Sequence, residues 1–162
     1  MALRQIRTIP DPILRKTCRL VDKITPKILE LMDDMRETMT KADGVGIAAP
    51  QVGVLKRIIM VEVEGKFLEL INPHVLEETG QVLSLEGCLS IPDVMAYVYR
   101  PQSIKIQGLN REGKLVAFNI TGMLAVAISH EMDHINGILF TDKQVEPTEE
   151  EEKAYLKSVE NQ

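Results

Sequence analysis

Hydrophobic residues recur at steps of three and four through residues 25–43, the spacing typical of an amphipathic helix. The apolar positions on this face are Ile28, Leu31, Met32, Met35, Met39 and Ala42. Thr25 is a candidate N-cap, Pro26 suits the first helical position, and Gly44 suits the end of a helix. We therefore predict an N-terminal amphipathic helix here.

Short apolar stretches separated by turn residues indicate strands in the middle of the chain. Residues 57–63 and 67–73 flank Glu64-Gly65, and residues 103–109 and 115–120 flank a loop ending at Gly113. Both arrangements are typical of β-hairpins, where glycine supplies the positive φ of a tight turn. Glycine and proline interrupt the segment GVGIAAPQVG, which begins at Gly44, so we predict that it is irregular.

Two further helices are predicted toward the C-terminus. Residues 123–135 form a long, mostly apolar stretch that Asn136-Gly137 would end, and Thr148 precedes Glu151 by three residues, as in a capping box. Hairpins without strand–helix–strand alternation favour an α+β fold over a parallel sheet. We expect one domain, 1–162, with antiparallel sheets packed around the helix at 123–135, and with N-terminal and C-terminal helices.

Composition narrows the class of protein. At 162 residues and 44% hydrophobic, the chain can bury one self-sufficient core. A formal net charge of −5 argues against nucleic acid as a direct partner, because phosphate binding rests on clustered lysine and arginine. The two cysteines suggest no disulfide framework, and no apolar run approaches the length of a membrane span. We therefore expect a cytoplasmic protein without membrane partners.

The chemistry-bearing signal is the HExxH motif His130-Glu131-Met132-Asp133-His134. On a helix both imidazoles lie on one face, where they can share a metal ion, while Glu131 stands beside its bound water. The alternative is a buried helix whose histidines are merely hydrogen-bonded. Burying two histidines and a glutamate without a partner is costly, which favours the metal.

A catalytic site of this type needs a third protein ligand and an open position. Phe140 stands where one known extension of the motif requires histidine, so that arrangement is excluded. A glutamate of the acidic segment 146–152 would complete an endopeptidase-like site. Cys88 is the other candidate, since a thiolate binds iron, zinc or cobalt, although a small buried core residue is also consistent with it.

Three blocks together resemble the signature motifs of peptide deformylases: GVGIAAPQ at 44–51, EGCLS at 86–90 and HEMDH at 130–134. The resemblance covers nearly the whole chain. It implies that Cys88, His130 and His134 hold Fe²⁺, which Zn²⁺, Ni²⁺ or Co²⁺ can replace. It also implies hydrolysis of N-formylmethionyl peptides of newly synthesised proteins, with release of formate.

In this resemblance a metal-bound hydroxide attacks the formyl carbon, with Glu131 as general base and then acid. Metal ions lower the pKa of bound water toward about 7, which agrees with that role. The side chain of Gln51 and the backbone N–H of Leu89 would stabilise the oxyanion. Without the motif, a surface position is the simpler interpretation of Gln51.

The resemblance also assigns residues to substrate and support. It gives Val45, Gly46 and Gly87 the backbone contacts with the peptide. Helical position gives the expected pocket for the methionine side chain, because Met123, Val126 and Ala127 lie three to seven residues before His130 on the same face. Arg100 would pair with Glu86 and orient the loop of Cys88. The ordinary alternatives are a flexible turn, plain core and a surface arginine.

Some positions depart from the commonest family pattern: Ile47, Asp93 and Ser129. The acidic C-terminal segment does not support ribosome docking through a basic helix. Besides the deformylase and the endopeptidase, a non-catalytic relative that binds formylated peptides is a third hypothesis. The intact set of Gln51 with the three metal ligands and Glu131 favours catalysis.

Overall fold

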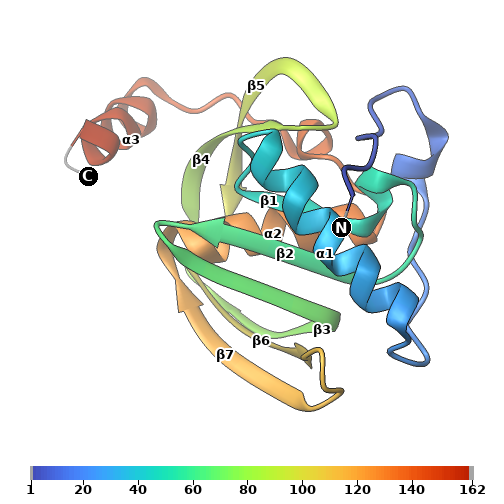
Figure 1. Cartoon of the computed structure of the whole chain (residues 1–162). Coiled ribbons are helices and arrows are strands. Elements are labelled where there is room, and N and C mark those ends of the chain that lie inside the picture. Colours follow the sequence, from blue (N-terminus) through green and yellow to red (C-terminus); the bar gives the residue numbers. More distant parts are fainter. Residues whose placement is uncertain (1, 161–162) are drawn as a thin grey trace.

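The computed structural model describes residues 2–160 and contains two sheets, three α-helices and three 3₁₀ helices (Figure 1). The helices are η1 (Pro12–Arg15), α1 (Pro26–Lys41), η2 (Ala49–Val52), α2 (Gly122–Ile135), η3 (Phe140–Lys143) and α3 (Glu149–Glu160). The strands are β1 (Gly46–Ala48), β2 (Ile58–Val63), β3 (Lys66–Thr79), β4 (Val82–Cys88), β5 (Ile91–Arg100), β6 (Ser103–Leu109) and β7 (Leu115–Thr121).

Every strand pair is antiparallel, as predicted. Five strands form one sheet in the order β1-β2-β3-β6-β7, and β4 pairs with β5 alone. The β2–β3 hairpin turns at Glu64-Gly65, both of which have positive φ, so that Val63 faces Lys66 across the turn. The β6–β7 hairpin turns through Gly113, which also has positive φ.

The prediction of an irregular segment after Gly44 is wrong in part. Residues Gly46–Ala48 form β1, with Gly46 opposite Val61 of β2, and a 3₁₀ turn follows. Pairing with a fully formed neighbouring strand outweighs the low strand propensity of glycine. The strand β3 also continues past Asn72-Pro73 through a register shift, and the β4–β5 pair has no counterpart among the predicted hairpins.

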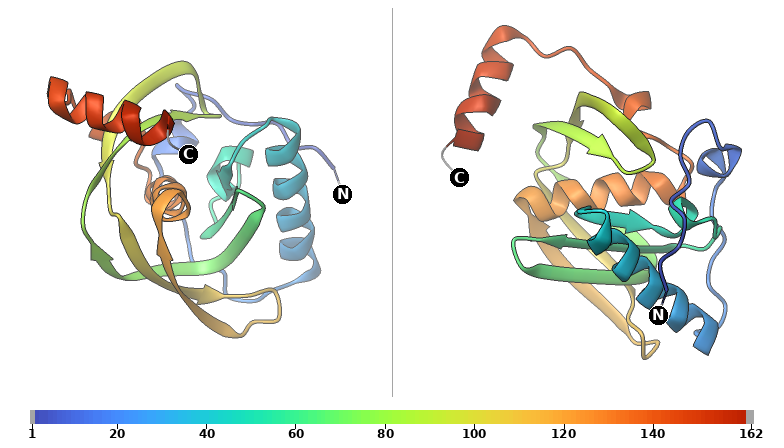
Figure 2. Two further views of the ribbon diagram at one scale, coloured as in Figure 1. Left: turned by 90° about the vertical axis from the view of Figure 1, so that its left-hand side faces the viewer. Right: turned by 45° about the horizontal axis from the view of Figure 1, so that its top comes forward.

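The strand β2 is buried on both faces, which explains its nearly continuous apolar run. Ile58 and Met60 pack in the core formed with α1, whereas Ile59, Val61 and Val63 pack in the core formed with α2. The left view of Figure 2 looks nearly along α2 and shows strands on several sides of it. The HExxH motif at residues 130–134 lies on this helix.

The two C-terminal helices begin and end at residues with clear physical roles. Gly137, just after α2, has a φ of 74°, and a Cβ there would lie 2.7 Å from the carbonyl carbon of Arg15. The predicted capping box of α3 is present: Thr148 Oγ1 accepts from the Glu151 N–H, and Glu151 Oε1 accepts from the Thr148 N–H. Within residues 2–160 no helix is long and apolar enough to cross a membrane.

Candidate active site

Three possible metal ligands converge between α2 and the end of β4. His130 and His134 lie one turn apart on α2, and Cys88 is the last residue of β4. One ligand atom from each lies within 4.8 Å of the others, and Cys88 Sγ is 3.1 Å from His134 Nε2. This is the only such group found among the residues that the structure describes.

The chemistry of this donor set fits a transition metal. A thiolate and two imidazoles bind zinc or iron at about 2.0–2.3 Å and leave a fourth position open. Burial lowers the pKa of His134 to about 3, with the charges of His130 and Arg100 adding to the effect, so its ring stays neutral and keeps a lone pair. Such a ring is the form of histidine that binds metals.

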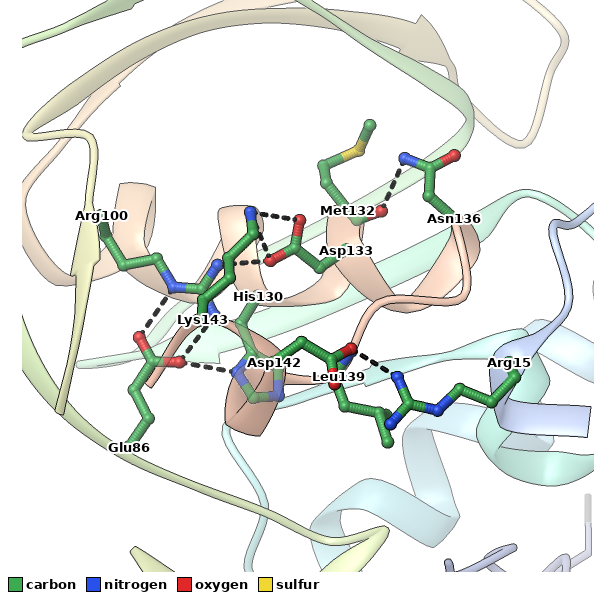
Figure 3. A network of polar contacts seen from close by, with 10 residues as sticks. All are labelled: Arg15, Glu86, Arg100, His130, Met132, Asp133, Asn136, Leu139, Asp142 and Lys143. Carbon is green, nitrogen blue, oxygen red and sulfur yellow. Dashed lines mark hydrogen bonds and ion pairs between the residues drawn. The ribbon is translucent and has the colours of Figure 1, made fainter. Parts of the chain in front are cut away.

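A buried network of charges orients His130 (Figure 3). Glu86 Oε1 accepts from His130 Nδ1 at 2.8 Å, and Arg100 donates to both Glu86 oxygens at 2.8 and 2.9 Å. Arg100 also donates to Asp133 at 2.6 Å, and Lys143 donates to the same carboxylate. With Nδ1 engaged, His130 Nε2 is left for the metal.

This network also fixes the charge of Glu86. Burial of the carboxyl works against ionisation, but the hydrogen bonds from His130 and Arg100 outweigh it and lower the pKa of Glu86 to about 2. Arg100 is itself 2% exposed, so neither partner is shared with bulk water. Glu86 is therefore ionised at neutral pH, behind the ligands.

Glu131 lies beside the ligands with one oxygen uncommitted. Its Oε1 is buried and has no hydrogen-bond partner among the described residues, and burial raises the pKa of Glu131 to about 7. Gly46 of β1 provides the space, since a Cβ there would lie 3.0 Å from Glu131 Cδ and closer still to Oε2. The carboxyl can therefore both take and give a proton near neutral pH.

Gln51 is buried rather than on the surface. Its Oε1 accepts from the Ala48 N–H at 2.9 Å, and its Nε2 donates to Ser90 Oγ at 3.1 Å. The same nitrogen lies 3.7 Å from Cys88 Sγ. The amide is thus held with its donor group toward the ligand cluster.

One cleft of about 670 Å³ connects these groups. The predicted site residues that line it are Val45, Gly46, Gln51, Glu86, Gly87, Cys88, Leu89, Met123, Val126, Ala127, His130 and Glu131. His134 and Arg100 are buried behind the lining. A cleft of this size is typical of sites that bind small molecules or short peptide segments.

Sequence reasoning missed several contributors. Asp133 completes the arginine network, Ser90 holds Gln51, and part of α3 reaches the cleft. Of these, only Asp133 could have been found from the sequence, because it follows His130 by three residues on one helix and therefore lies near it. The carboxylates of Glu151 and Glu152 accept hydrogen bonds from tyrosines of β5 and are not part of the ligand group.

Comparison with known proteins identifies the family. The family model of polypeptide deformylases matches residues 3–150. The chain belongs to the polypeptide deformylase family. A peptide deformylase of Alkaliphilus metalliredigens is 56% identical over 143 residues, which cover 88% of this chain and 97% of that relative. Deformylases are metal-dependent enzymes that hydrolytically remove N-formyl groups from nascent peptides, and this protein is an enzyme of that family.

Solved structures of the family share the fold. The crystal structure of peptide deformylase from Thermotoga maritima superposes with a TM-score of 0.86 at 36% identity, covering 90% of this chain and 99% of that one. A class I type b peptide deformylase from Acinetobacter baumannii with bound Met-Ala-Ser superposes with a TM-score of 0.83 at 32% identity, covering 87% and 98%. The deformylase fold, with its antiparallel sheets and three helices, is thus the fold of this chain.

Proposed function

We propose that residues 1–162 form one catalytic domain that removes the formyl group from N-formylmethionyl chains during bacterial-type protein synthesis. The observation that carries this proposal is the convergence of the Cys88–His130–His134 group with an uncommitted Glu131, where Cys88, His130 and Glu131 line one cleft. Nascent chains as substrate support a proposed location in the cytoplasm. The acidic first turn of α3 offers no basic surface for ribosomal RNA, so we propose action without docking through this helix.

Fe²⁺ is the proposed resident ion, held by Cys88, His130 and His134, and Zn²⁺, Ni²⁺ or Co²⁺ would fit the same donors. When bound, such an ion supplies a Lewis acid that polarises the formyl oxygen and makes water a better nucleophile. Glu86 holds His130 in the ligating tautomer, and Arg100 in turn holds Glu86. The remaining steps belong to the protein's own side chains.

Glu131 is the proposed proton carrier. Its uncommitted oxygen takes a proton from the attacking water as that water's oxygen bonds to the formyl carbon. When the bond from the formyl carbon to nitrogen breaks, the same oxygen returns the proton to the departing amine, and formate is released. A pKa of about 7 suits both transfers at neutral pH.

The oxyanion of the tetrahedral intermediate needs donors already in place. Gln51 Nε2 and the backbone N–H of Leu89 are the proposed donors, because both residues line the cleft beside Cys88. The hydrogen bond from Ala48 to Gln51 Oε1 fixes the amide before substrate arrives. Preorganised donors of this kind require little rearrangement during the reaction.

The peptide is proposed to lie as a strand between two sheet edges. The strand β1 is an edge strand, and the Val45 carbonyl already accepts from the Glu62 N–H. By strand alternation, the peptide groups of Gly46 then face the open edge, toward the cleft. Gly87 of β4 is the proposed contact on the opposite side, while Val45 borders the cleft with an exposed side chain.

Met123, Val126 and Ala127 are the proposed wall of the pocket for the methionine side chain. All three line the cleft at the N-terminal half of α2, before the first histidine. We further propose that the sheets around α2 and the packing of α1 on β1 and β2 hold this wall and the ligands in register. The core that α1 forms with both strands supports this role.

The test is formate release from formyl-Met-Ala-Ser by anaerobically metallated enzyme. Cys88→Ala should lose metal and activity, whereas Cys18→Ala is the matched control, because Cys18 is buried away from the ligands and burial raises its pKa to about 11. Glu131→Gln should keep the metal and fall to near background turnover. A Cys88→Ala protein that keeps its metal but releases no formate would favour the endopeptidase hypothesis, and full turnover by Glu131→Gln would refute the proton carrier.

A further inference from the structure

The C-terminal helix α3 forms part of the cleft that holds the ligand cluster. Tyr155, Ser158 and Val159 line this cleft, and their spacing of three and four residues places them on one face of the helix. Figure 1 shows α3 beyond β4, at the end of the chain. The family match ends at residue 150, so almost all of α3 lies outside it.

Tyrosines of β5 attach the start of α3 to the body of the protein. Tyr99 donates a hydrogen bond to Glu151, and Tyr97 donates one to Glu152. The ring of Tyr97 also meets that of Tyr155 edge to face, with centroids 5.7 Å apart. These contacts set the direction of α3, yet none of its residues is buried. The contacts with β5 therefore fix the position of α3, while the side chains on its cleft face remain at least partly exposed.

Strand β4 and helix α2 line the same cleft with apolar side chains, and the lining also includes the catalytic centre. Val82, Leu83 and Leu85 of β4 line the same cleft, as does Met123 of α2. No lysine or arginine is among the described lining residues, whereas Asp43 is one of them. The cleft thus disfavours acidic groups and provides apolar contact beyond the proposed methionine pocket.

We infer that α3 is a specificity wall that binds an apolar side chain of the substrate peptide downstream of the formylated methionine. This inference rests on the proposed function. A peptide held along the β1 and β4 edges advances about 3.3 Å per residue, so residues after the methionine leave the centre through the part of the cleft that remains open. Val159 and Tyr155 are the side chains that they would meet there.

Val159 offers a clean substitution with a matched control. Val159 is 45% exposed and lines the cleft, whereas Leu156 is 49% exposed on the same helix and does not line it. Val159→Ser and Leu156→Ser remove similar apolar groups from similarly exposed positions. Neither residue belongs to the tyrosine contacts that hold α3, and circular dichroism would check that both variants keep their helix content.

The assay compares kcat/KM for formyl-Met-Ala-Ala-Ala with that for three peptides carrying leucine at position two, three or four. One apolar group in an enclosed pocket changes kcat/KM by about 10–200-fold, and we expect about fivefold for leucine over alanine in this open cleft. The natural enzyme and Leu156→Ser should show this preference at one position at least. Val159→Ser should lose most of it.

A charge in the cleft provides a second, independent measurement. Val159→Lys should raise kcat/KM for a peptide with aspartate at the responsive position relative to leucine, because the wall then carries a cation. The wall is refuted if leucine and alanine peptides are hydrolysed equally by the natural enzyme, or if Val159→Ser and Leu156→Ser behave alike. Failure of the natural enzyme to release formate from formyl-Met-Ala would refute the proposed function itself.

Discussion

Replacing Arg100 with methionine should damage both the stability of the protein and its hold on the metal. Arg100 is 2% exposed and donates to both oxygens of Glu86 and to Asp133. Methionine fills similar space but removes all three hydrogen bonds that Arg100 donates to Glu86 and Asp133. Removing one member of a buried ion pair costs about 3–5 kcal/mol, because the other charge stays buried.

The pKa of Glu86 leads to a similar figure. A fall from the ordinary value of 4.5 to about 2 corresponds to about 3 kcal/mol at neutral pH, part of which His130 supplies. The depressed pKa favours the ionised form, so this stabilisation is present above about pH 4.5 and is lost as the pH falls toward 2. The deficit of Arg100→Met should therefore be full at pH 7 and shrink in acid.

Arg111 provides a matched control elsewhere in the molecule. Arg111 also donates to both oxygens of one carboxylate, Glu69, and to a second, Asp33, but its side chain is 29% exposed. Arg111→Met should cost about 1 kcal/mol or less, because exposed ion pairs are weak. It should leave the metal site unchanged.

Urea unfolding of the metal-free proteins, followed by circular dichroism at pH 7, measures the first effect. Competition with a chelator for Zn²⁺ measures the second, where loss of support behind a ligand weakens affinity by about 10–100-fold. Equal destabilisation by Arg100→Met and Arg111→Met would refute the role of burial. Unchanged zinc affinity in Arg100→Met would refute the support of His130 through Glu86.

Three further perturbations test the site from different sides. Gly46→Ala places a methyl group against the Glu131 carboxyl, and since misplacement by about 1 Å can cost about 100-fold, kcat should fall to that extent while metal content by elemental analysis stays full. Gln51→Leu removes an oxyanion donor and should lower kcat about 100–1000-fold in the formate assay; a change confined to KM would contradict that role. The iron form should lose activity in air as the Cys88 thiolate oxidises, whereas zinc or nickel forms should persist; equal half-lives in timed air exposure would contradict this.

Local signals in the sequence predicted the three α-helices and two hairpins, but neither the 3₁₀ helices nor the sheet edge at β1. The helix at 26–41, the stop at Gly137 and the turn at Glu64-Gly65 all depend on residues close in the chain. The segment at Gly46 is a strand only because β2 lies beside it. Glycine is needed there because a side chain would collide with the carboxyl group of Glu131, not because the backbone must be flexible. A tertiary partner of that kind leaves no periodic signal.

The site residues also differ in how far the sequence alone could predict them. Helical spacing alone put His130 and His134 on one face, whereas Cys88 lies 46 positions before His134. Thiolate chemistry made Cys88 one of two candidates for the third ligand, and only the motif resemblance selected it. The contribution of α3 to the cleft was beyond reach, because it depends on Tyr97 and Tyr99 binding carboxylates more than 50 positions further along. The acidic residues at the start of α3 have the pattern of a solvated helix start, and two of them, Glu151 and Glu152, also attach the helix to the tyrosines of β5.

The buried network explains how ligands from two elements meet at one point. Cys88 belongs to β4 and the histidines to α2, so their separation depends on how the two elements are joined. Glu86, two residues before Cys88, binds His130 of α2 directly and Arg100 of β5, which binds Asp133 of α2. This clamp links β4, β5 and α2 through protein contacts alone. Burying those charges lowers the stability that the network provides. In exchange, the network fixes the relative positions of the ligands in the folded protein before the metal binds.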